Sequence, residues 1–334
     1  MRRRYWLLAL LGLGLGLGIP LLLGGRAILP ALGQMPWWWL PMLLLVIAVC
    51  WILNAGRLRL LACGAGLRLS YRRALGILMA TEFAISATPG GSGGPVTYAW
   101  LLRREGLPGP LGVALYAVDQ LFDMLFFLVA LLALLLYWLL VPAEWHPGWQ
   151  VGGLGGLLLG GLGVVFLFMR YYRRLLLRGG RLLDRLRVSP RTRRRLARWV
   201  IEFRRSLRLV QTYPWPRLLA VAGLCGLHWL LRYSVLYLAV LGVGGAIPWS
   251  YTFIVQMLSL SAGQATLLPG GSGGVEASGS LLLAPYLEPA TAAAAILVWR
   301  FATFYWYLIA GAPVFALMAG RPLWGRLHRN AEPS

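Results

Sequence analysis

The chain has 334 residues, of which 59% are hydrophobic, and its formal net charge of +22 comes from arginine because the sequence contains no lysine. Apolar runs of about 20 residues, the length that crosses the hydrocarbon core of a bilayer, recur along it. This composition excludes a soluble enzyme and predicts an all-α polytopic membrane protein. We expect one transmembrane domain over residues 1–330 with about six spanning helices. In such a protein the positive charge reports orientation and contact with anionic lipid, so we expect no nucleic-acid partner.

The first two predicted spans precede a basic loop. Three arginines at residues 2–4 lead into a span over residues 5–23, which places the N-terminus in the cytoplasm. Four glycines of this span recur at the spacing that lets membrane helices pack closely, namely Gly12, Gly14, Gly16 and Gly18. A second span runs from Trp37 to about Asn54, and the arginine-rich loop that begins at Arg57 is predicted to be cytoplasmic.

The rest of the chain carries four more predicted spans and its most basic segment. The third span covers residues 111–140, and the fourth covers 151–169 after a connection without Lys or Arg that suits the outside. Residues 170–217 hold 16 arginines and are predicted to be a cytoplasmic, amphipathic segment on the anionic inner leaflet. The fifth span covers 218–241 and the last covers 291–319, and the arginines that follow it predict a cytoplasmic C-terminus.

A glycine-rich hexapeptide occurs twice, at an offset of 180 residues, and interrupts an apolar stretch each time. The copies consist of Pro89, Gly90, Gly91, Ser92, Gly93 and Gly94 and of Pro269, Gly270, Gly271, Ser272, Gly273 and Gly274. Proline removes a backbone donor and glycine disfavours helix, so neither copy is predicted to lie inside a helix. Within a membrane such backbone is tolerated only where it is buried in protein or lines a cavity. The pair is therefore a candidate functional site.

The distribution of arginine predicts how the two interrupted segments run. If both crossed the membrane completely, the segment with 16 arginines would fall outside, against the positive-inside bias. If both instead fold back as helical hairpins, every basic loop is cytoplasmic and the hairpins enter from opposite faces. A Ser-Tyr dipeptide at 70–71 recurs at 250–251, again 180 residues later. We therefore predict two re-entrant hairpins in an inverted-topology repeat over about 70–140 and 250–319.

Each hexapeptide precedes a predicted half-helix that begins at about Val96 or Val275. The free N–H groups and the positive dipole end at such a start form an anion site, as in the discontinuous helices of transporters. Two such starts that face each other suit a headgroup that carries phosphate. The alternative is that the glycines serve only the close packing of the hairpin helices.

Ionisable residues inside the spans form a second signal, because charge is costly at that depth. They are Asp119 and Asp123 in the third span, Arg232 in the fifth, Arg300 in the last and Glu276 after the second hexapeptide. We predict that these residues bind substrate together with the hexapeptides. The alternative is that Asp119 and Asp123 neutralise Arg232 and Arg300, and an ion pair that opens for a lipid phosphate would satisfy both. The spacing of cysteines suggests no metal site, so we expect neither a metal nor a cofactor.

Residues 88–95 and 268–276, which contain the hexapeptides, resemble the flippase-like family of the lysylphosphatidylglycerol synthase transmembrane region. The resemblance extends from the second span to the last. The second block is similar to the family pattern Pro-Gly-Gly-x-Gly-x-x-Glu through Glu276, whereas the first departs from it at Gly94-Pro95. The resemblance implies translocation of a lipid or handling of its headgroup. Nothing in the chain resembles the aminoacyl-transferase domain of full-length synthases, so lysine transfer by this chain alone is not expected.

Three functions follow as hypotheses. The first is a flippase or headgroup transporter of the inner membrane, whose partner is an anionic membrane lipid: a phospholipid, a glycolipid or a polyprenyl phosphate. The second is an intramembrane serine hydrolase that uses Ser92 or Ser272 with His228. The third is a membrane transferase that acts on a lipid-linked phosphate. The glycine-rich spans also permit a homo-oligomer.

Overall fold

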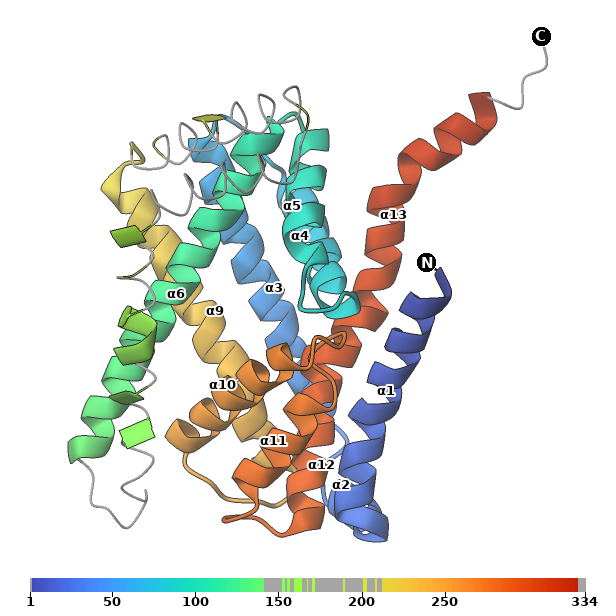
Figure 1. Ribbon diagram of the computed structural model, residues 1–334, viewed down its shortest axis with the longest axis vertical. Helices are drawn as coiled ribbons and strands as arrows, with labels where there is room; N and C mark the ends of the chain where they lie inside the picture. The colour runs from blue at the N-terminus through green and yellow to red at the C-terminus, as the bar shows by residue number, and fades with distance from the viewer. Residues whose placement is uncertain are drawn as a thin grey trace.

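The structure, a computed structural model, describes residues 2–140 and 212–329, and single positions between 152 and 208 (Figure 1). Every element within the two long ranges is helical. Among the described residues, strand-like pairing is limited to one isolated antiparallel bridge, between Pro89 and Pro269. The all-α prediction is therefore confirmed for this part of the chain.

Among the described residues, five stretches are long and apolar enough to cross a membrane. They are Gly14–Gly33, Trp39–Gly64, Gly109–Leu140, Trp215–Gly242 and Pro289–Gly320. These stretches belong to α1 (Arg2–Gly24) with α2 (Ile28–Gly33), to α3 (Trp39–Gly64), α6 (Gly109–Leu140) and α9 (Trp215–Gly242), and to α12 (Pro289–Arg300) with α13 (Trp306–Arg329). A short 3-10 turn at Gly25–Ala27 joins α1 to α2, and a π-helical turn at Phe301–Tyr305 joins α12 to α13. The fourth predicted span, 151–169, and the basic segment 170–217 lie mostly outside the described residues.

Helix α3 continues about ten residues beyond the predicted end of the second span. It ends at Gly64, and Gly66 follows with φ +83, a left-handed conformation that glycine adopts without strain. Arg57 and Arg59 therefore lie within the helix, and their assignment to a loop was wrong. The physical reason is that the charge of Arg57 is neutralised by acids of another helix, which a hydropathy pattern along one segment cannot register.

Each hexapeptide joins two short helices that pack against each other. The first hairpin consists of α4 (Tyr71–Ala87) and α5 (Gly93–Arg104), and the second consists of α10 (Trp249–Ala265) and α11 (Gly274–Leu283). The hairpins occupy opposite halves of the molecule, and their loops point toward each other near its middle (Figure 1). The bridge between the two loop prolines shows that the loops meet.

The apolar core is divided into two clusters, one around each hairpin. One cluster joins α9, α10 and α12 and includes Phe253 and Trp299. The other joins α3, α4 and α5 and includes Leu61 and Ile77. This division leaves the polar side chains of the long helices between the two clusters, at the level where the loops meet.

Candidate functional site

The two hexapeptide loops share a left-handed pair of glycines, although they differ later, where Gly273 has φ +85 and Gly93 already belongs to α5. Gly90 and Gly91 have φ values of +58 and +69, and Gly270 and Gly271 have φ values of +61 and +65. This left-handed region costs residues with a side chain about 1–2 kcal/mol each, so the fold requires glycine at these four positions. The repetition of the sequence is thus also a repetition of local structure.

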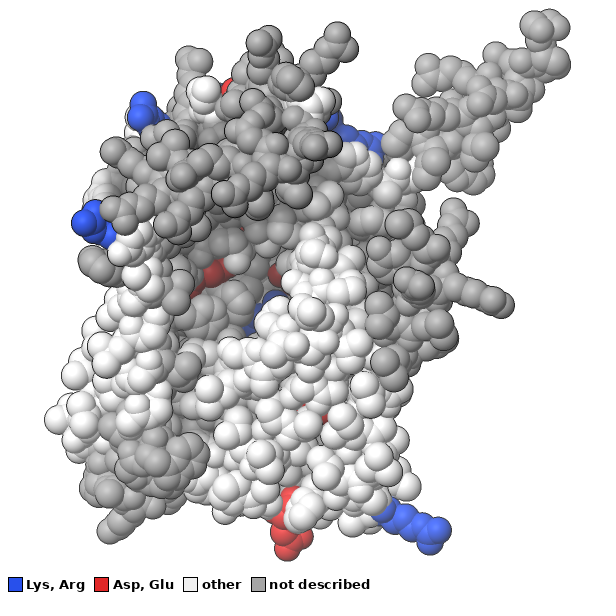
Figure 2. Space-filling model, viewed as in Figure 1, with Lys and Arg blue, Asp and Glu red and all other residues white. Residues whose placement is uncertain are grey.

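A cavity of about 450 Å³ lies between the loops. Of the predicted site residues, it is lined by Gly90, Gly91, Asp119, Asp123, Arg232, Gly270, Gly271 and Arg300. The fold therefore brings together residues from both hairpins and from three long helices. Figure 2 shows acidic and basic side chains inside a hollow on this face of the molecule. The other predicted residues lie outside the lining, namely Pro89, Ser92, Gly93, Gly94, Pro269, Ser272, Gly273, Gly274 and Glu276.

The strongest charge cluster of the cavity is centred on Arg57, whose side chain is only 2% exposed. Its Nε lies 2.6 Å from Asp119 Oδ1, and its Nη1 donates to Asp123 Oδ1 at 2.7 Å. The alternative in which these two acids neutralise Arg232 and Arg300 was wrong, because both acids pair with Arg57. A signal was present in the sequence, since residues 58–64 are mostly apolar and continue the helix beyond the arginine.

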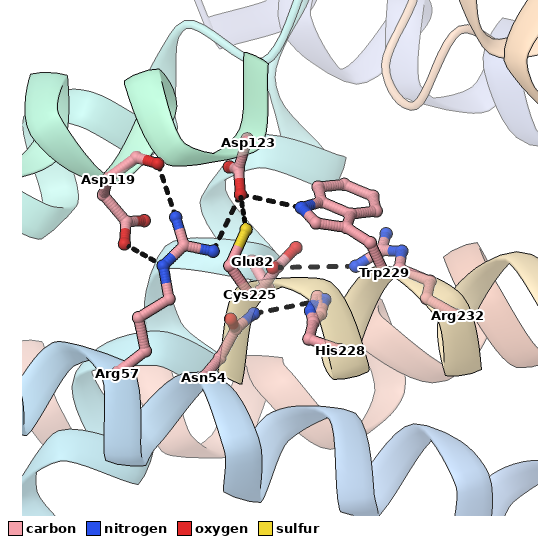
Figure 3. A network of polar contacts seen from close by, with 9 residues as sticks. All are labelled: Asn54, Arg57, Glu82, Asp119, Asp123, Cys225, His228, Trp229 and Arg232. Carbon is pink, nitrogen blue, oxygen red and sulfur yellow. Dashed lines mark hydrogen bonds and ion pairs between the residues drawn. The ribbon is translucent and has the colours of Figure 1, made fainter. Parts of the chain in front are cut away.

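Asp123 also binds helix α9. Its Oδ1 accepts hydrogen bonds from Trp229 Nε1 at 2.7 Å and from Cys225 Sγ at 3.4 Å (Figure 3). One carboxylate thus connects α3, α6 and α9. Because a buried carboxylate with several donors is costly to disrupt, this cluster serves as a fixed wall of the cavity.

Arg232 is held less tightly than Arg57. Its Nη1 lies 3.7 Å from Glu82 Oε1, and its side chain is 19% exposed. The same nitrogen donates to Tyr307 Oη at 2.9 Å, and the guanidinium lies over the rings of Trp229 and Tyr307. Among the ion pairs of the cavity wall, this arginine is therefore the most accessible to a ligand.

Glu276 stabilises the second loop from behind the cavity wall, and its side chain is fully buried. Its Oε1 accepts a hydrogen bond from Arg300 Nε at 2.6 Å, and its Oε2 accepts one from the backbone N–H of Gly273 at 2.6 Å. Arg300 in turn donates from Nη2 to the carbonyl of Gly270 at 3.0 Å. The carboxylate of the chain itself therefore occupies the start of α11.

The start of α5 is capped as well. The backbone N–H of Gly93 donates to Thr88 Oγ1 at 2.8 Å. With Gly273 N–H bound by Glu276, both amides at the half-helix starts have partners within the chain. At these two amides a nearby side chain already supplies the acceptor that a bound anion would otherwise provide.

The serines of the hexapeptides hydrogen-bond within their own loops. Ser92 Oγ donates to the Pro89 carbonyl at 3.0 Å, and Ser272 Oγ makes the equivalent bond at 2.9 Å. His228 instead contacts Asn54, with 3.3 Å between Nε2 and Nδ2. No hydrogen bond among the described residues joins His228 to either serine, so the dyad of the hydrolase hypothesis is not assembled. The described part of the chain also holds no group of three potential metal ligands.

Comparison with known families agrees with this architecture. The family model for the lysylphosphatidylglycerol synthase TM region matches residues 9–311, which include both hairpins and every residue of the cavity wall. None of the curated proteins compared with the chain matches it. The family and the five long apolar helices together identify a multi-pass membrane protein. The chain belongs to the family of the lysylphosphatidylglycerol synthase transmembrane region.

Proposed function

We propose that the protein translocates a lipid across the membrane and binds its phosphate-bearing headgroup in the cavity between the two loops. The observation that carries this proposal is a charged cavity lined by both hexapeptides in a protein of five long apolar helices. Charge at such depth is expensive and is typical of a substrate path. The volume of about 450 Å³ falls within the range of small-ligand sites, so it suits a headgroup while the acyl chains stay in the bilayer.

The proposed topology places both hairpins as re-entrant elements of an inverted repeat over about 70–140 and 250–319. The opposed hairpins whose loops meet support it, because broken helices of inverted repeats meet near the midplane in transporters. The arginine distribution supports an inner membrane with both termini in the cytoplasm. The substrate then has access to the cavity from either side as one hairpin or the other moves.

Arg232 is the proposed ligand of the lipid phosphate. The cavity wall carries three arginines and also three acids, Glu82, Asp119 and Asp123, so a phosphate must displace a carboxylate from an arginine. The contact of Arg232 with Glu82, at 3.7 Å, is longer than the contacts of Arg57 and Arg300 at 2.6 Å. Exchange of Glu82 for phosphate therefore costs the least of the three.

Reconstitution into liposomes tests this function. The rate at which a fluorescent phospholipid or polyprenyl phosphate moves between leaflets is measured by chemical quenching from outside. We expect the protein to accelerate movement, and we expect Arg232→Gln to lower the rate about tenfold or more, the effect of losing a charged hydrogen bond. Arg73→Gln is the matched control, since Arg73 is exposed and pairs with Glu105 away from the cavity. Equal rates in protein-containing and empty liposomes for every lipid would contradict the proposal.

A further inference from the structure

A second cavity, here called the α3–α9 groove, lies near the C-terminal end of α3. Its volume is about 590 Å³, and its apolar floor is formed by Gly56 and Leu60 of α3, Leu69 of the following loop and Leu224 of α9. The two α3 residues are four positions apart and so share one face of the helix. Arg57 points elsewhere, into the central cavity. The two cavities share no lining residue.

Two exposed arginines line this groove. Arg59 donates from Nε to the Leu69 carbonyl at 3.0 Å, and its guanidinium lies 5.2 Å from the ring centre of Tyr71. Arg68 has no hydrogen bond or ion pair with any residue of the described part of the chain. None of the described residues that line the groove is acidic. In the central cavity, by contrast, each arginine meets a carboxylate.

The position of the groove, together with its arginines, indicates which kind of ligand it suits. Helix α3 is long enough to cross a membrane and ends at Gly64. From its length we place Arg59 and Arg68 at the level of lipid headgroups, with the apolar lining of the groove extending along the helix. Arginines near a helix end attract anionic headgroups, and guanidinium groups bind phosphate in a bidentate manner. A ligand that satisfies both features carries a negative charge at one end and a hydrocarbon chain at the other.

We propose that the α3–α9 groove binds an acidic phospholipid of the adjacent leaflet. Its phosphate lies between Arg59 and Arg68, and one acyl chain lies along Leu60 and Leu224. This binding site is separate from the proposed translocation path and does not depend on lipid transport.

Cys63 provides a direct test, because it lines the groove and is exposed whereas Cys50 and Cys225 are buried. The full chain is placed in nanodiscs of phosphatidylcholine alone or with phosphatidylglycerol, and the rate of Cys63 modification by an uncharged maleimide is measured by mass spectrometry. We expect phosphatidylglycerol to slow modification. In Arg68→Gln the lipid concentration required for protection should rise about fivefold, the effect expected for one arginine at a membrane surface.

Arg72→Gln is the matched control, since Arg72 is a nearby exposed arginine that does not line the groove, and it should keep full protection. Thermal unfolding of each variant confirms that the fold is retained. Equal modification rates with and without phosphatidylglycerol would overturn the proposal, as would protection that Arg68→Gln leaves unchanged. Protection by inorganic phosphate in phosphatidylcholine nanodiscs would also overturn it, because the ligand would then be a free ion.

Discussion

The two hairpins share a hexapeptide and its left-handed pair of glycines, but they satisfy an equivalent backbone donor in different ways. Gly93 and Gly273 occupy equivalent positions, 180 residues apart. The N–H of Gly93 donates to the neutral hydroxyl of Thr88, which precedes the loop. The N–H of Gly273 donates to the carboxylate of Glu276, which follows it. In both hairpins the backbone N–H at this position has a side-chain acceptor. The comparison shows that the acceptor can come from a residue before the loop or from one after it.

Because the cap of Gly273 is a buried carboxylate, the second hairpin also needs an arginine to neutralise its charge. Glu276 is fully buried, and Arg300 neutralises it at 2.6 Å. In the first repeat both members of this pair are replaced by neutral residues, because Val96 of α5 and Gln120 of α6 stand at the equivalent positions. A buried carboxylate without a partner is costly, so the two replacements are physically linked.

The surroundings of the loops differ as well. Ser272 is buried, whereas Ser92 is exposed. Gly12 and Gly16 of α1 lie against the second loop, where an added Cβ at either position would contact Ser272. The second hairpin is therefore covered by α1 and held by a buried ion pair, and we expect the first hairpin to move more easily than the second during the proposed transport.

Glu276→Val should have the largest effect on stability. It leaves Arg300 buried without its carboxylate and uncaps Gly273, at a cost of about 3–5 kcal/mol. The triple variant Leu268→Thr, Glu276→Val, Arg300→Gln places at these three positions the residues found 180 positions earlier. It should recover at least half of the stability lost in Glu276→Val. Thermal unfolding in detergent measures both. A triple variant no more stable than Glu276→Val would show that the two caps are not equivalent.

Gly270→Ala should be more harmful than Gly90→Ala, although the two glycines are equivalent in sequence. Both substitutions cost about 1–2 kcal/mol of stability, because alanine disfavours the left-handed conformation. At Gly270 the new Cβ would also overlap the ring of Phe304, which adds about 1–3 kcal/mol, whereas at Gly90 the nearest atom would be Leu267 Cδ2 at an ordinary 3.7 Å. The difference between the two unfolding temperatures is the measurement, and equal losses would contradict the unequal packing of the loops.

Gly16→Ala should weaken the packing of α1 against the second loop. The added Cβ would lie 2.6 Å from Tyr305 Oη and 3.4 Å from Glu276 Oε1, and we expect a loss of about 1–3 kcal/mol. Gly14→Ala is the control on the same helix, since nothing lies within 4 Å of its Cβ position. The expectation fails if the melting curves of the two variants coincide.

Thr88→Ala should have the smallest effect, a loss of about 1 kcal/mol, because it removes the hydroxyl cap from Gly93. Thr88→Ser keeps the hydroxyl and should retain most of the stability. Unfolding temperatures of the three proteins decide the matter, and a serine variant as unstable as the alanine variant would assign the effect to the lost methyl group instead.

Several features of the site were predictable because they depend on local chemistry. The run of proline and glycine in each hexapeptide disfavours helix, so both breaks followed from the sequence. The same holds for the location of four ionisable residues within long apolar segments, namely Asp119, Asp123, Arg232 and Arg300. Glu276 does not line the cavity; its carboxylate lies behind the wall, where it binds Gly273 and Arg300. Arg57 was missed, since its acids stand as far as 66 residues away in the chain.

Hydropathy, the distribution of arginine and the repeated hexapeptide by themselves determined a multi-pass helical membrane protein with two interrupted segments. These are properties that each segment carries alone, whatever it packs against. Only the tertiary structure decided which arginine meets which acid, that the two loops touch, and that Ser272 is buried whereas the equivalent Ser92 is exposed. Those outcomes depend on residues distant in sequence, because a buried charge or a tight glycine contact is set by the neighbours that the fold supplies.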